Sequence, residues 1–126
     1  MWQSFNPNPL NNRVGDCTVR AICKALDADW YNIYIELCLE GLEMADMPSA
    51  NHVWGSFLRK KGFQRIPMPE SCPDCYTVSE FCKNNPHGRF ILALNNHVVA
   101  IIDGISYDTW DSSDENILYV WKRKEF

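Results

Sequence analysis

The spacing of hydrophobic and polar positions changes along the chain. In the first two thirds, apolar residues recur at i, i+3, i+4 and i+7, which predicts amphipathic helices. In the last third, short apolar runs rich in β-branched residues are separated by turn residues, which predicts strands. We expect helices over 17–26, 30–44, 49–62 and 77–85, and strands over 63–66, 89–94, 98–102, 105–110 and 116–121.

Helices that precede antiparallel strands predict an α+β domain. The chain has 126 residues, 46% of them hydrophobic, which suits a single domain over 1–126 with one main core. Pro7 and Pro9 favour extended backbone before them, so the first ten residues are expected to wrap the domain surface.

Charge and composition exclude several classes of partner. With 16 acidic and 12 basic residues the net charge is −4, which argues against nucleic acid as a partner. No apolar run approaches the ~20 residues of a membrane-spanning helix, so no membrane is expected. Residues 1–9 lack a secretory signal pattern, and we expect a cytoplasmic location in which the six cysteines form no disulfide framework. Oligomeric state stays open.

The stretch Asn11–Leu26 carries the first candidate for chemistry. It is a polar loop that delivers Cys17 to the first turn of a helix, with Asp16 as the expected N-cap. Helix N-termini favour thiolate over thiol and hold oxyanions, so Cys17 is a candidate nucleophile. The structural alternative is a small core cysteine on an apolar helix.

A predicted hairpin carries the second candidate. The Asp103-Gly104 turn aligns residues whose numbers sum to 207. His97, Asp108 and Trp110 then share one face of the sheet, with Asp108 diagonal to His97 and within reach of its ring. Asp111 is the alternative carboxylate, and either aspartate could instead cap the turn after the strand.

These residues resemble the papain-like cysteine peptidase superfamily. The first similarity is Cys17 at the start of a helix. The second is the run Asn96–Gly104, in which His97 begins a strand that ends in a glycine turn. The third is Asp108–Trp110, which stands where the family has Asn-Ser-Trp. It implies N-terminal helices with the nucleophile helix packed on a C-terminal antiparallel sheet. The family's oxyanion glutamine, six positions before the cysteine, falls on Asn11, and the adjacent Asn12 is an alternative.

The resemblance implies a thiol hydrolase that cleaves a peptide, isopeptide or side-chain amide bond through a thioester on Cys17. His97 would be the base, with Asp108 orienting it, and Trp110 would shield their contact. Asp16 and Asp111 are supporting or alternative residues. The expected substrate is a peptide or a protein, and no metal or cofactor is expected.

Two other functions stay open. One is a catalytically silent papain-like domain that acts as a binding module or inhibitor. The other is a zinc-stabilised interaction domain using Cys72, Cys75, Cys82 and His87, since Cys72 and Cys75 form a C-x-x-C pair with the other two at spacings of seven and five. The predicted helix around Cys82 disfavours zinc, and no βαβ pattern supports a redox role for the pair.

Overall fold

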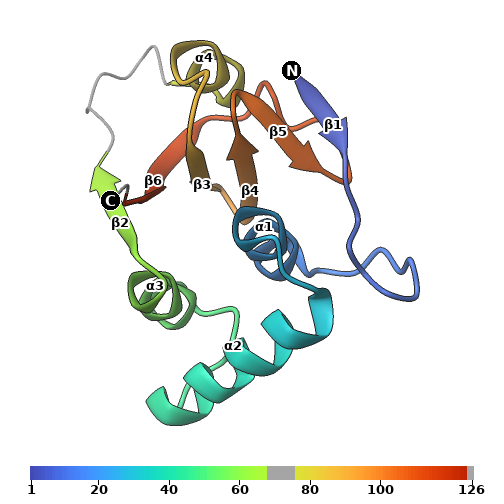
Figure 1. Ribbon diagram of the computed structural model, residues 1–126, viewed down its shortest axis with the longest axis vertical. Helices are drawn as coiled ribbons and strands as arrows, with labels where there is room; N and C mark the ends of the chain where they lie inside the picture. Colours follow the sequence, from blue (N-terminus) through green and yellow to red (C-terminus); the bar gives the residue numbers. More distant parts are fainter. Residues whose placement is uncertain (68–75, 125–126) are drawn as a thin grey trace.

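The computed structural model describes residues 1–67 and 76–124, which form an α+β domain (Figure 1). Within the described residues there are four helices and six strands; the strand over Trp2–Ser4 was not expected, and the other elements follow the order expected from the sequence. The helices are α1 (Cys17–Leu26), α2 (Trp30–Met44), α3 (Asn51–Lys60) and α4 (Val78–Asn84). The strands are β1 (Trp2–Ser4), β2 (Phe63–Pro67), β3 (Arg89–Leu94), β4 (His97–Ile102), β5 (Ile105–Asp108) and β6 (Ile117–Arg123).

The strands form one sheet in the order β1-β5-β4-β3-β6-β2. Five strands pair antiparallel, as expected, but β1 pairs parallel with β5, so the sheet is mixed. Trp2–Ser4 is extended and exposed, as expected for a segment that wraps the surface, but its pairing with the sheet was not predicted. An edge strand offers unpaired backbone groups, and the extended N-terminal segment satisfies those of β5.

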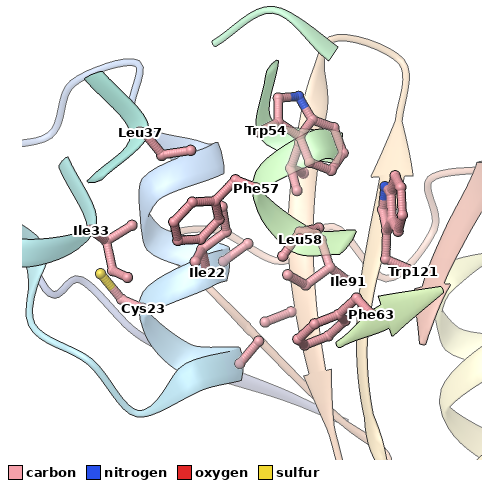
Figure 2. Close-up of a cluster of buried hydrophobic side chains, with 14 of the residues drawn as sticks. Ile22, Cys23, Ile33, Leu37, Trp54, Phe57, Leu58, Phe63, Ile91 and Trp121 are labelled. Atoms are coloured by element: carbon pink, nitrogen blue, oxygen red, sulfur yellow. The ribbon is translucent and has the colours of Figure 1, made fainter. Parts of the chain in front are cut away.

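The sheet is covered on both faces. α1, α2 and α3 gather on one side, where their apolar residues form the larger core cluster with the sheet (Figure 1). Figure 2 shows this cluster, with side chains from the three helices meeting those of β2, β3 and β6. α4 covers the opposite face with Val78, Phe81 and Cys82. The chain therefore has two apolar layers, one on each side of a shared sheet.

Strand alternation divides the central strands between these layers. On β3, Ile91 and Ala93 belong to the larger cluster, while Phe90, Leu92 and Leu94 belong to the cluster under α4. Because both faces are buried, the strand reads as a continuous apolar run instead of an alternating one. The sequence of residues 90–94 therefore predicts a strand but shows no alternation between a buried and an exposed face, because neither face is exposed.

The four helix starts differ in whether a side chain caps them. At the start of α2, the Asp29 carboxylate accepts a hydrogen bond from the backbone N–H of Asn32 at 2.7 Å. At the start of α4, the Thr77 hydroxyl accepts one from the backbone N–H of Glu80 at 3.2 Å. α3 begins at Asn51, two residues later than expected, and no side chain caps its start. Asp16 does precede α1, but its side chain makes no capping bond.

The hairpin register is confirmed. Ile102 lies opposite Ile105, and the ladder continues to Ala100 opposite Tyr107. β4 begins one residue earlier than expected, at His97, and β5 ends at Asp108 because the chain bends at Thr109 and Trp110. His97 and Asp108 therefore lie at the same end of the hairpin, far from its turn.

In residues 1–67 and 76–124, none of the helices is both long enough and apolar enough to cross a membrane.

The hairpin turn gives a test of the fold. Asp103 and Gly104 both have positive φ, at 49° and 77°, as a type I′ turn requires. Replacing Gly104 by Ala costs about 1 kcal/mol for the left-handed backbone. It also brings a Cβ to 3.1 Å from the carbonyl oxygen of Cys82. We expect Gly104→Ala to lower the free energy of unfolding, measured with urea, by clearly more than 1 kcal/mol.

Gly62→Ala is the matched control. Gly62 also has positive φ, at 89°, but a Cβ there would meet nothing within 4 Å. This variant should carry the backbone strain alone. Equal losses of stability in the two variants would contradict the close packing of the turn against the end of α4.

Candidate active site

Cys17 occupies the first position of α1, where backbone N–H groups have no acceptor inside the helix. α1 packs against β4, the strand that His97 opens (Figure 1). The Cys17 side chain is half-buried, and it lines a hollow of about 460 Å³ that His97 also lines. We call this the thiol hollow. The structure thus brings the predicted nucleophile and the predicted base to one cavity.

The His97 ring is hydrogen-bonded to the Asp108 carboxylate. Its Nε2 lies 2.6 Å from Oδ2 of Asp108, and the carboxylate is only 1% exposed. This bond uses Nε2 and leaves Nδ1 as the second ring nitrogen. The ring of Trp110 lies 4.9 Å from that of His97, centroid to centroid, at the outer side of the site, and Trp110 itself is 43% exposed. Asp108 lies beside His97 as the hairpin register predicted, whereas Trp110 meets the His97 ring from the bend after β5 and not from the strand itself.

Asp111 has a different environment. It is exposed, and its Oδ1 accepts from the backbone N–H of Ser113 at 3.1 Å and from the Ser113 hydroxyl. These bonds lower the pKa of Asp111 by stabilising its charged form. Of the two candidate carboxylates, the structure brings Asp108 to His97 and places Asp111 in its own turn.

The electrostatics favour a thiolate beside an imidazolium. Burial alone would raise the pKa of Cys17, but the His97 ring outweighs it, as a hydrogen-bond partner and as a positive charge. The backbone N–H of Val98 and the charge of Arg20 act in the same direction, so the net pKa falls below 9.0. Cys23, buried on the same helix without such partners, has its pKa raised to about 12.

The pKa of His97 moves the other way. Burial lowers it, but bonds to Asp108 and Cys17 raise the pKa from 6.5 to about 9. The folded protein therefore holds this proton more tightly than the unfolded chain does. The stabilisation that results is complete below pH 6.5 and is lost as the pH rises through about 9.

Asp108 is saturated with donors. Oδ1 accepts from the Thr109 backbone N–H at 2.8 Å and from Arg20 Nη2 at 3.2 Å. Oδ2 accepts from the Ser112 hydroxyl at 3.0 Å in addition to His97. Burial would raise the pKa of Asp108, but the bonds to His97, Ser112 and Thr109 lower it. The carboxylate is therefore kept ionised and fixed in orientation.

Asp16 is turned toward the protein interior. Its Oδ1 lies 2.5 Å from Arg20 Nη1, and its Oδ2 accepts from Trp30 Nε1 at 2.9 Å. Asp16 and Arg20 are 7% and 6% exposed. Sequence reasoning missed Arg20 and Ser112 as parts of the site. The i, i+4 spacing of Asp16 and Arg20 on an otherwise apolar helix was the available signal for the first of them.

The candidate oxyanion asparagines lie elsewhere in the loop. Asn11 is exposed with a positive φ of 59°. The backbone N–H of Asn12 donates to Asn8 Oδ1 at 3.2 Å, and its carbonyl accepts from Asn6 Nδ2 at 3.1 Å. Neither Asn11 nor Asn12 is among the residues that line the thiol hollow, whereas Asn51, Asn95 and Asn96 are.

A second cavity of about 500 Å³ adjoins the thiol hollow. The two share Gly15, Thr18 and Ser49 in their linings. Half of the residues that line it are apolar or aromatic, and we call it the apolar hollow. They include Val14, Val19, Trp30, Tyr34 and Leu37, with the rings of Trp30 and Tyr34 stacked at 4.9 Å.

The alternative zinc ligands are only partly described. Cys82 is buried among the apolar residues under α4, and His87 is exposed. Cys72 and Cys75 lie outside the described residues. Among residues 1–67 and 76–124, no three potential metal ligands cluster together.

No protein-family model, curated protein or solved structure matches this chain.

The bond between His97 and Asp108 gives a direct test. Asp108→Asn removes the negative charge that raises the pKa of His97, so we expect that pKa to fall from about 9 to well below it. NMR titration of the His97 ring protons measures the change. Asp111→Asn is the matched control, and it should leave the His97 titration unchanged. An equal shift in both variants would contradict the assignment of Asp108.

Proposed function

We propose that this protein is a thiol hydrolase of the papain-like type that cleaves an amide bond through a thioester on Cys17. The observation that carries the proposal is the arrangement of Cys17 and His97 around one hollow, with Nε2 of His97 bonded to buried Asp108 at 2.6 Å. A nucleophile, a base and a group that orients the base are the parts that acyl transfer requires.

The fold is consistent with this assignment. The nucleophile opens a helix, α1, that packs against the sheet, and the base and its carboxylate follow on consecutive antiparallel strands. The chain order of cysteine, histidine and acid is that of the papain-like superfamily. The parallel edge strand β1 pairs with β5 on the side away from β4, with Ser4 opposite Asp108, and leaves the pairing of β4 with β5 in place.

The first half of the reaction uses three groups. The Cys17 thiol gives its proton to His97, and the sulfur attacks the carbonyl carbon of the substrate. The carbonyl electrons move to the oxygen, and the Cys17 backbone N–H, which has no acceptor inside the helix, donates to this oxyanion. When the tetrahedral intermediate collapses, the C–N bond breaks and His97 protonates the leaving amine. The products of this half are a thioester and a free amine.

The second half restores the enzyme. His97 removes a proton from water, the resulting hydroxide adds to the thioester carbon, and the C–S bond breaks. The thiolate of Cys17 and the imidazolium of His97 are thereby regenerated, and a carboxylic acid leaves. Asp108 stabilises the imidazolium in both halves and keeps Nδ1 available to the substrate side.

The two cavities support a peptide or protein as the substrate. Three asparagines, Asn51, Asn95 and Asn96, are among the residues that line the thiol hollow, and asparagine can hydrogen-bond an extended amide-bearing chain. The apolar hollow begins at Gly15 and Thr18, directly beside Cys17. An apolar side chain a short distance from the cleaved bond would fit there. A peptide, isopeptide or side-chain amide meets these requirements.

Alkylation tests the state of the thiol. We expect iodoacetamide at about pH 7 to modify Cys17 at least about tenfold faster than Cys38, a half-buried cysteine on α2, because the rate follows the thiolate fraction. His97→Ala should remove this advantage. Peptide mass mapping of the alkylated protein measures both rates. Equal rates at the two cysteines would contradict the ion pair.

Turnover tests the hydrolase directly. Cys17→Ala should reduce hydrolysis of a mixed fluorogenic peptide pool by at least about 10³-fold, because removing the nucleophile removes the thioester route. Cys38→Ser is the control and should retain turnover. Circular dichroism should show that both variants fold. A Cys17→Ala protein that still hydrolyses the pool contradicts the proposal, and a wild-type protein that binds peptides without turnover favours the silent binding module.

A further inference from the structure

We propose that Arg20 is a positioning residue of this site, which ties the start of the nucleophile helix to the carboxylate behind the base. The inference rests on the proposed thiol hydrolase. Neither a motif nor the family resemblance pointed to Arg20, and it carries no chemistry of its own. Its role follows from where its guanidinium lies.

Arg20 bridges two carboxylates that are far apart in the sequence. Nη1 lies 2.5 Å from Asp16 Oδ1, beside the nucleophile, and Nη2 lies 3.2 Å from Asp108 Oδ1, behind the base. Arg20 itself is on α1, three residues after Cys17, and is only 6% exposed. A single side chain therefore connects α1 to the end of β5 within the protein interior.

Both oxygens of each bridged carboxylate accept hydrogen bonds. Asp16 has one oxygen on Arg20 and the other on the Trp30 indole. On Asp108, Arg20 and the Thr109 N–H share Oδ1, which leaves Oδ2 for His97 and for the Ser112 hydroxyl. The carboxylate of Asp108 cannot rotate without breaking the contact to Arg20. Arg20 thereby fixes which oxygen faces His97.

Arginine is required by this geometry. Its planar guanidinium presents donors in two directions, so Nη1 and Nη2 can serve two carboxylates at once. The single ammonium group of lysine cannot reproduce both contacts in the same positions. The charge matters as well, because one buried cation stands between two buried anions and close enough to Cys17 to favour its thiolate.

This role differs from ordinary structural support. A buried arginine that only held the fold together would affect the temperature of unfolding and leave the chemistry of the thiol unchanged. A positioning residue must alter the pH profile of Cys17, because it holds the His97–Asp108 pair in place and adds positive charge near the sulfur.

Arg89 supplies a matched control. It anchors the other end of α1, where Nη1 donates to the Ala25 carbonyl at 3.0 Å and Nη2 lies 2.9 Å from Asp27 Oδ2. It therefore ties the same helix to the sheet, through β3, without contacting the thiol or its partners. Arg89→Met tests the structural contribution of such an anchor alone.

The experiment follows alkylation of Cys17 by iodoacetamide from about pH 5 to about pH 10 in the full chain, with thermal unfolding in parallel. Arg20→Met should move the midpoint of the profile upward by about one pH unit, which slows alkylation at about pH 6 roughly tenfold. Arg20→Lys should give an intermediate midpoint, because it keeps the charge but reaches one carboxylate. Arg89→Met should lower the unfolding temperature without moving the midpoint.

The outcomes separate this inference from the proposed function. A wild-type midpoint near 9 would contradict the hydrolase itself, whatever the variants do. A depressed wild-type midpoint that stays the same in Arg20→Met overturns the role of Arg20, as does an equal shift in Arg89→Met. If Arg20→Met does not fold, Arg20→Lys decides, because it keeps a buried cation. If the Arg20→Lys profile matches that of the wild type, the proposed role of the bridge from Asp16 to Asp108 is wrong.

Discussion

The contact between α1 and β4 is the constraint on which the site depends. Small residues, Ala21 and Ala25 on the helix and Ala100 on the strand, belong to the larger core cluster and let the two backbones approach closely. Cys17 opens the helix and His97 opens the strand, so the distance between thiol and imidazole is set by this packing. The apolar core thus fixes the relative position of Cys17 and His97, which lie at its edge. Looser packing between α1 and β4 would first misalign the thiol and the imidazole.

Removing charged side chains from water costs free energy, and at this site each buried charge lies next to one of opposite sign, which offsets that cost. From the thiol of Cys17 inward, negative and positive groups follow one another through His97, Asp108, Arg20 and Asp16. Each carboxylate has donors on both of its oxygens, so the buried charges are paired and also hydrogen-bonded. A chain of this kind resists reorientation, which is what electrostatic support of a reaction needs.

The parts of the fold that were predictable are those encoded locally. Helical periodicity predicted α1 and α2 at their observed bounds, and the Asp103-Gly104 turn predicted the register of the hairpin. That register placed His97 near Asp108 from the sequence alone. The approach of Cys17 to His97 was expected only through the family resemblance, because they are far apart in sequence and no periodicity relates them. The parallel pairing of β1 with β5 was missed for the same reason.

Asp16 shows why the site departs from the local rules. An aspartate before a helix favours capping, because its carboxylate can accept from the free N–H groups of the first turn. Here Arg20 and Trp30 draw the carboxylate inward, and the cap bond is not made. The first-turn N–H groups and the positive end of the helix dipole therefore stay available beside Cys17, where a thiolate or an oxyanion can use them. The local stability that the cap would supply is given up at the one helix start where an uncapped end favours the proposed chemistry.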